Sequence, residues 1–297
     1  MLPIDTIQSL RSKVNLELAA LEHRLGEKTP LRDAVTYTLC SEGKRYRPII
    51  VLLVAEALEK NQDVVPAALS VEFFHSASLI ADDLPCMDNA SMRRGKPTTH
   101  TLYGQSAALL ASYTLISLGY EYVAKNTSLI QKTDPSFAEV GLLAMETVTN
   151  AAGIFGATSG QFFDLFSPDS SLETLEKIVY QKTVTLFEIS FVLGWLFGGG
   201  DKNLIDQVKS LAYHMGMAFQ IADDLDDLQE DLLKETDTMV SVMGIEKSEE
   251  RFLQETASYR AILKNLKIET APLIFLIEML EEAFFSSRKK LSSNMYL

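Results

Sequence analysis

Two short stretches of the chain concentrate carboxylates in patterns that suit metal-ion chemistry. The segments LIADDLPCMDNASMRRGKPT (79–98) and FQIADDLDDLQED (219–231) each place acids directly after an apolar run. The candidate metal ligands are Asp82, Asp83, Asp88, Asp223, Asp224 and Asp227. Like charges one helical turn apart are destabilising unless a cation lies between them. Mg²⁺ prefers oxygen ligands, often one or two carboxylates together with substrate phosphates. The stretches therefore predict a metal–phosphate site, and solvated acidic helix ends are the alternative.

Basic side chains accompany the first acidic stretch. EGKRYRP (42–48) places three of them, Lys44, Arg45 and Arg47, before an apolar segment. Cations beside a helix start suit phosphate binding, although a solvated basic turn would show the same pattern. Arg93 and Arg94 follow the first aspartates by one short loop. They are candidates for phosphate contacts, or for salt bridges to those same acids.

Further polar residues interrupt apolar helical patterns. Lys182 and Thr183 lie in IVYQKTVTLFEIS, where a lysine either extends outward or points into a polar cavity. His75 precedes Asp82 by seven residues, which places it on nearly the same helical face, although a histidine satisfied within the core fits equally. Gln161 and Gln220 are candidate buried amides.

Helices must position these groups. Apolar residues recur at helical spacing over 31–40, 49–60 and 210–228, and no sustained two-residue alternation is present. The chain is therefore predicted to be all-α, with about ten helices in one domain spanning 1–297. Asp223 and Asp227 should share one helical face. Pro85 should disturb the helix at the first acidic stretch and let Asp88 come round toward Asp82 and Asp83.

Composition narrows the possible functions. The chain has 297 residues, 47% of them hydrophobic, and a formal net charge of −13. Such a charge argues against a general nucleic-acid or anionic-membrane surface. No run of about 18 apolar residues without charge is present, so no membrane span is expected. Two cysteines, Cys40 and Cys86, form no disulfide framework and favour a reducing cytoplasm.

The motifs together resemble those of the trans-isoprenyl diphosphate synthases. GKRYRP, VEFFHSASLIADDLPCMDNASMRRGKPT, GQFFDL, QKT and FQIADDLDD occur in the family's order and spacing from about residue 40 to residue 230. The resemblance implies a large helical bundle around a deep cavity. It also implies isopentenyl and allylic diphosphate substrates, up to three Mg²⁺ ions bound with the substrate diphosphate, and a homodimer.

The resemblance also assigns roles by position. The six aspartates match the two metal-binding motifs. Residues that match positions contacting the allylic diphosphate are Arg93, Lys182, Thr183, Gln220 and, in a shortened loop, Lys234. Residues that match positions binding isopentenyl diphosphate are Lys44, Arg47, His75 and Arg94. Arg45, Gln161 and Asp164 match supporting positions.

Product length in this family depends on side-chain bulk before the first motif. Ala77 and Ser78 are small there, which favours a twenty-carbon geranylgeranyl product with Phe74 or Phe73 as the floor. Tyr113 could close the cavity earlier, so a fifteen-carbon farnesyl product is the alternative. A class I terpene cyclase, a non-catalytic regulatory subunit and a plain helical scaffold are the rival interpretations. The intact DDLDD motif argues against the cyclase, the presence of both aspartate motifs argues against the regulatory subunit, and the plain scaffold is favoured less than either.

Overall fold

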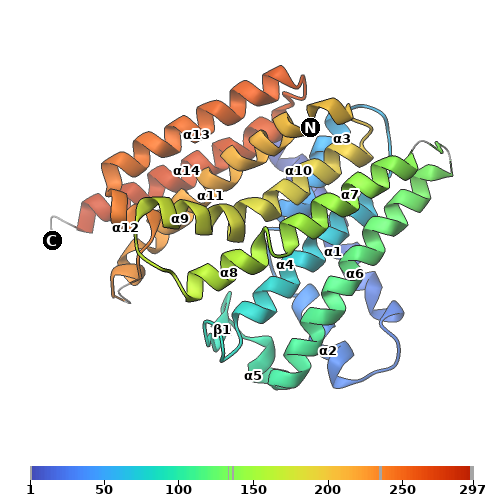
Figure 1. Ribbon diagram of the computed structural model, residues 1–297, viewed down its shortest axis with the longest axis horizontal. Coiled ribbons are helices and arrows are strands. Elements are labelled where there is room, and N and C mark those ends of the chain that lie inside the picture. The colour runs from blue at the N-terminus through green and yellow to red at the C-terminus, as the bar shows by residue number, and fades with distance from the viewer. Residues whose placement is uncertain (1, 133, 136, 234–235, 295–297) are drawn as a thin grey trace. The chain divides into compact units, whose positions relative to one another are not determined.

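The computed structural model describes residues 2–132, 134–135, 137–233 and 236–294. Helices dominate the described residues, which confirms the predicted all-α class (Figure 1). The chain divides into two compact units, which are described separately below. Unit 1 comprises residues 1–149 and 192–200, and unit 2 comprises residues 150–191 and 201–297. The first aspartate motif belongs to unit 1 and the second to unit 2.

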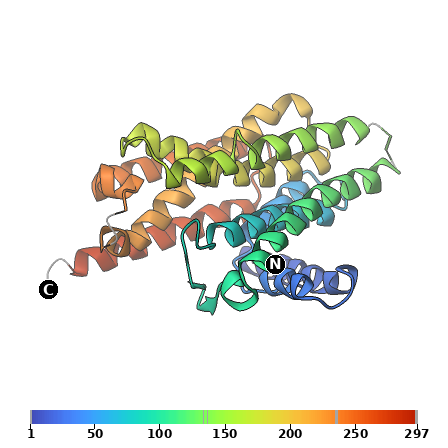
Figure 2. The ribbon, with the colours of Figure 1, turned by 60° about the horizontal axis from the view of Figure 1, so that its bottom comes forward.

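Unit 1 contains the N-terminal helices and a small hairpin. Its elements are α1 (Pro3–Ala20), η1 (Leu21–Arg24), α2 (Pro30–Leu39), α3 (Tyr46–Ala57), α4 (Val65–Asp82), β1 (Met92–Arg93), β2 (Lys96–Pro97), α5 (Thr99–Tyr103), α6 (Gln105–Gln131), most of α7 (Phe137–Ala152) and the end of α10 (Thr185–Phe197). Helices α4 and α6 pack side by side (Figure 2). Twelve of the 18 residues of α4 are buried, because apolar side chains occupy most of its circumference.

Unit 2 is organised around one long helix. Its elements are the end of α7, then α8 (Ala157–Leu165), α9 (Leu172–Val179), the π-helical turn η2 (Tyr180–Val184), the first half of α10, η3 (Lys202–Leu204), α11 (Ile205–Leu233), α12 (Met239–Met243), α13 (Ile245–Asn265) and α14 (Ala271–Asn294). Helix α11 packs against α13 and α14. Gly244, with φ of 80°, separates α12 from α13, in a backbone conformation that favours glycine.

One segment has the length and composition of a membrane-spanning helix. It covers Phe137–Leu165, and 33% of its apolar window is buried. The sequence alone predicts no membrane span. A turn over residues 153–156 divides it into α7 and α8. Core helices satisfy the same length and composition test, so this segment by itself is weak support for a membrane span.

Candidate functional site

The first aspartate motif lies where α4 ends. Asp82 is the last residue of the helix, and Asp83 is its C-cap. The backbone N–H of Asp88 donates to the carbonyl of Asp82 at 2.9 Å, so the chain returns after Pro85, as the sequence predicts. The three carboxylates differ in exposure, because Asp83 is only 4% exposed, whereas Asp82 is half-buried and Asp88 is exposed.

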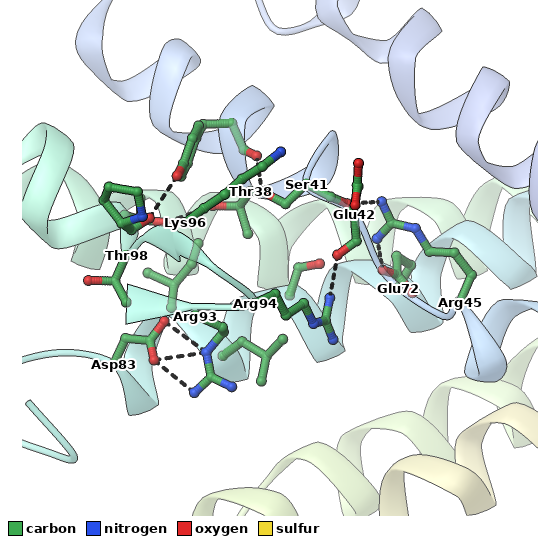
Figure 3. Close-up of a pocket in the computed structure, with 16 residues that line it drawn as sticks. Thr38, Ser41, Glu42, Arg45, Glu72, Asp83, Arg93, Arg94, Lys96 and Thr98 are labelled. Carbon is green, nitrogen blue, oxygen red and sulfur yellow. Dashed lines mark hydrogen bonds and ion pairs between the residues drawn. The ribbon is translucent and has the colours of Figure 1, made fainter. Parts of the chain in front are cut away.

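A two-residue hairpin turn presents the arginines beside this motif. Arg94 and Gly95 have φ of 52° and 73°, as a type I′ turn between β1 and β2 requires. Arg93 turns back to Asp83, and its Nε lies 2.9 and 3.0 Å from the two carboxylate oxygens. Its Nη2 lies 2.7 Å from Oδ1 (Figure 3). Arg93 therefore forms a salt bridge with Asp83, which the sequence predicted as the alternative to a phosphate contact.

Arg45 is a buried anchor for the loop before α3. Its guanidinium pairs with Glu72 on α4, and both side chains are only 4% exposed. Nη2 donates to the carbonyls of Leu39 and Ser41 at 2.7 and 2.6 Å, and Nε donates to Oδ1 of Asn15 at 3.0 Å. Arg45 itself adopts a left-handed backbone with φ of 54°. These contacts hold the loop in place, and a supporting role in substrate binding stays a prediction.

The neighbouring loop also contacts the hairpin. Nη1 of Arg94 donates to the carbonyl of Glu42 at 3.1 Å, so Arg94 points away from Arg93 (Figure 3). A Cβ at Gly43 would lie 2.8 Å from the same nitrogen, which shows how closely the guanidinium approaches this backbone. Lys44 is exposed, with Nζ 5.9 Å from the centre of the Tyr46 ring.

His75 lies within a field of positive charge. Burial, followed by the charges of Arg47, Arg94, Arg93 and Arg45, holds the pKa of His75 well below its ordinary value. Its Nδ1 is buried without a hydrogen-bond partner among the described residues. A neutral imidazole can donate one hydrogen bond to an anion without adding charge. Together with these arginines it forms a local environment that favours phosphate.

The cavity between the two ion pairs is small. It has a volume of about 50 Å³ and includes Arg45, Glu72, Asp83, Arg93 and Arg94 in its lining (Figure 3). Such a space holds a few water molecules. A second cleft of about 760 Å³ lies at the opposite end of α4, and none of the predicted site residues lines it.

The second aspartate motif lies on α11. Asp223 and Asp227 are exposed and one turn apart, as predicted. Asp224 is only 6% exposed. Its Oδ1 accepts from Gln220 at 2.8 Å, and its Oδ2 accepts from the backbone N–H of Met239 at 3.1 Å. Burial, reinforced by the charge of Asp223, raises the pKa of Asp224 to about 6.

Residues from η2 and α8 add further polar contacts within unit 2. Nζ of Lys182 lies 2.6 Å from Oδ2 of Asp164, and Oγ1 of Thr183 donates to Oε1 of Gln220 at 2.8 Å. A Cβ at Gly160 would lie 2.3 Å from the backbone nitrogen of Lys182, so α8 approaches the π-helical turn closely. Gln161 is half-buried on α8. The predicted Lys234 lies outside the described residues.

The arrangement of the carboxylates has a direct consequence for metal binding. Within the described residues, no group of three or more acidic, histidine or cysteine side chains is gathered around a cation position. The exposed carboxylates nevertheless supply hard oxygen donors of the kind that Mg²⁺ prefers. Each motif can hold a cation only together with further ligands, such as water or phosphate oxygens.

The predicted product-length residues lie along α4 and α6. Ala77 is 2% exposed, and its carbonyl accepts from Oγ of Ser112 at 3.0 Å. Phe74 packs on α6, where a Cβ at Gly119 would lie 2.5 Å from its ring. Phe73 packs edge-on against Tyr122 and is fully buried. Ser78 is half-buried and donates to the carbonyl of His75 at 2.9 Å.

Tyr113 is placed differently from its neighbour Ser112. Its side chain is 57% exposed, whereas Ser112 faces α4. Tyr113 therefore does not cover Ala77 within unit 1, and its role in product length stays a prediction. The sequence analysis also missed Glu72, although a lone acid in the apolar run VEFFHSASLI is itself a signal of a buried partner.

Comparison with known proteins identifies the family. The family model for polyprenyl synthetases matches residues 28–241. The chain is 36% identical over 265 residues to geranylgeranyl pyrophosphate synthase 7, chloroplastic, from Arabidopsis thaliana, covering 83% of this chain and 74% of the relative. It is 36% identical over 286 residues to geranylgeranyl pyrophosphate synthase 10, mitochondrial, from the same plant, covering 87% and 80%.

Solved structures agree. A geranyltransferase from Legionella pneumophila matches with a TM-score of 0.82 at 27% identity, covering 96% of this chain and 98% of that one. A synthase from Zymomonas mobilis described as FPP/GFPP matches with a TM-score of 0.78 at 28% identity, covering 92% and 98%. The chain therefore belongs to the polyprenyl synthetase family and is a prenyltransferase.

Proposed function

We propose that this prenyltransferase condenses isopentenyl diphosphate with an allylic diphosphate, with Mg²⁺ as cofactor, to give geranylgeranyl diphosphate. The observation that supports the reaction best is that the chain contains both exposed aspartates, which suit a metal ion, and a group of arginines around a neutral His75, which suits phosphate. The names of the plant relatives support the twenty-carbon product.

The acidic residues supply the metal-binding part of the proposal. Asp82 and Asp88, brought together by the turn after α4, and Asp223 and Asp227, one turn apart on α11, provide exposed or half-buried oxygen donors. These donors fit Mg²⁺. When bound, Mg²⁺ neutralises the charge that develops on the leaving diphosphate.

The basic residues supply the binding and orienting part. Arg47, Arg94 and His75, with Lys44 at the exposed edge, hold the isopentenyl diphosphate in the proposed assignment. Lys182 and Thr183 orient the allylic diphosphate in unit 2. Holding each substrate by its diphosphate orients the isopentenyl double bond and the allylic carbon that it attacks as diphosphate leaves.

Chain length follows from the residues below the first motif. Ala77 is small, and Phe74 lies about two turns from Asp82 toward the start of α4. A growing tail that passes Ala77 meets aromatic bulk only at Phe74 or beyond. The solved relatives from Legionella and Zymomonas, whose descriptions refer to geranyl transfer and to FPP and GFPP, support farnesyl diphosphate synthesis as the second candidate.

Two further proposals concern the surroundings of the enzyme. Exposed apolar residues of α6, including Leu109, Leu110, Tyr113 and Ile116, support a homodimer. Light scattering of the purified protein would test it, and a monomer would refute it.

The free cysteines Cys40 and Cys86 support a cytoplasmic location. Fluorescent tagging in cells of the source organism would test that proposal.

The decisive experiment is a product assay. The purified protein is incubated with Mg²⁺, isopentenyl diphosphate and, separately, dimethylallyl, geranyl and farnesyl diphosphates, and the dephosphorylated products are sized. A twenty-carbon alcohol is expected, and a fifteen-carbon alcohol would favour the farnesyl alternative. Asp82→Asn and Asp223→Asn should abolish turnover, whereas Asp226→Asn serves as a control in the same helix as Asp223. No product from any primer would refute the proposal and favour a regulatory subunit.

A further inference from the structure

Asp224 is the point where three elements of unit 2 meet. Its carboxylate lies on α11, with one oxygen bonded to the side chain of Gln220 on the same helix and the other to the backbone N–H of Met239 at the start of α12. Gln220 in turn accepts from Thr183 in η2 at 2.8 Å. A continuous hydrogen-bonded chain thus runs from the π-helical turn through α11 to α12.

Helix α12 depends on contacts of this kind. It has only five residues, Met239–Met243, and a helix of this length is not stable alone in water. Thr238 caps it, and the Thr238 hydroxyl accepts from the N–H of Ser241 at 3.2 Å. The bond to Asp224 satisfies the N–H of Met239, which has no partner within a helix because it belongs to the first turn.

Asp224 differs from the flanking acids of its motif. Asp223 and Asp227 are exposed, whereas Asp224 is 6% exposed and both of its oxygens accept hydrogen bonds from the protein. Each oxygen of Asp224 already accepts one hydrogen bond, and the 6% exposure of the residue leaves little room for a hydrated cation beside the remaining lone pairs. Buried donors and acceptors that lose their partners are costly.

We propose that Asp224 is a positioning residue, which fixes α12 to the second aspartate motif and orients Thr183 through Gln220, and that it does not bind the metal itself. The proposal rests on the proposed function for the identity of the motif and its diphosphate ligand. The exposed Asp223 and Asp227 carry the metal contacts of the second motif.

The test distinguishes two possible roles of Asp224, attachment of α12 and binding of a cation. Hydrogen exchange of the backbone amides of 236–243 is measured without ligand for wild type and three variants, Asp224→Ala, Asp224→Asn and Asp223→Asn. Loss of the bond in Asp224→Ala should speed exchange in α12 about tenfold. Asp224→Asn should stay within about threefold of wild type, because an amide oxygen still accepts from Met239 and the amide of Gln220 can reverse. Asp223→Asn should leave exchange unchanged.

The second readout is thermal stabilisation by inorganic pyrophosphate as Mg²⁺ is raised. Asp223→Asn should increase the Mg²⁺ concentration at half-effect by about tenfold or more, and Asp224→Asn by no more than about threefold. Asp226→Asn is the matched control, since its partner is Ser287 at 2.6 Å and not α12. An equal increase for Asp224→Asn and Asp223→Asn would overturn the proposal, as would unchanged exchange in Asp224→Ala.

Two outcomes are kept apart by this design. If wild type shows no stabilisation by Mg²⁺ and pyrophosphate, the proposed function fails, while the exchange experiment still decides whether Asp224 holds α12. If Asp224→Ala does not fold, Met239→Pro removes the same hydrogen bond by deleting its donor, the backbone N–H of residue 239. Proline is tolerated at the first helical position, and Thr238 already has the extended backbone that must precede it. Unchanged exchange over 240–243 in that variant would also overturn the proposal.

Discussion

The buried pair of Arg45 and Glu72 makes unit 1 sensitive to the loss of either charge alone. Removing one partner of a buried ion pair costs roughly 3–5 kcal/mol, because the other charge stays buried without compensation. Both side chains here are 4% exposed, so this range applies without a discount for solvent screening. Glu72→Leu should therefore destabilise the protein by roughly 3–5 kcal/mol, and Arg45→Met by a similar amount.

The double variant is the informative one. Removing both charges leaves no isolated ion, so its destabilisation should fall short of the sum of the single variants by roughly 2 kcal/mol or more. It should not return to wild type, because the carbonyls of Leu39 and Ser41 lose the donors that Arg45 supplies.

The assay uses the fluorescence of the single tryptophan during urea unfolding. Trp195 is 2% exposed and lies in unit 1, so it reports on the unit that contains the pair. The exposed Glu42→Gln is the matched control and should stay within about 0.5 kcal/mol of wild type. Single variants within about 1 kcal/mol of wild type, or strictly additive effects, would refute the reasoning.

Three other predictions follow from unit 1. The pKa of His75 is lowered in the folded protein, so the unfolded state binds more protons below about pH 6.5 and the free energy of unfolding decreases as the pH is lowered. His75→Gln should reduce this pH dependence by up to about 1.4 kcal/mol per pH unit, as measured by urea unfolding at several pH values. Ala77→Phe should shorten the product to fifteen carbons, whereas Tyr113→Ala, at a 57% exposed position, should leave product length unchanged. Gly119→Ala places a Cβ 2.5 Å from the ring of Phe74 and should lower stability by about 1–3 kcal/mol in thermal melts.

Local patterns in the sequence predicted much of the framework. Apolar residues at helical spacing predicted the helices that carry the acidic motifs, because burial of one face or of every face dictates that spacing. Pro85 predicted the turn that brings Asp88 to Asp82, since proline disrupts the helix locally. These features depend on residues that are neighbours in the chain.

Features that depend on distant partners were not predictable in the same way. Glu72 pairs with Arg45 across 27 residues, and nothing near either residue identifies the other. The exposure of Tyr113 depends on which face α6 turns toward α4. The N–H that holds Asp224 comes from α12, fifteen residues further along, and only the folded unit brings them together.

Both aspartate motifs reduce the repulsion between their adjacent carboxylates in a similar way. Adjacent carboxylates repel, and each motif places the second of its paired acids in the protein interior with donors on both oxygens. Asp83 is held by a guanidinium and Asp224 by an amide and a backbone N–H. These attachments restrain the backbone that carries the neighbouring carboxylates. A site organised in this way loses less freedom when metal and diphosphate bind, which favours both affinity and alignment of the reacting carbons.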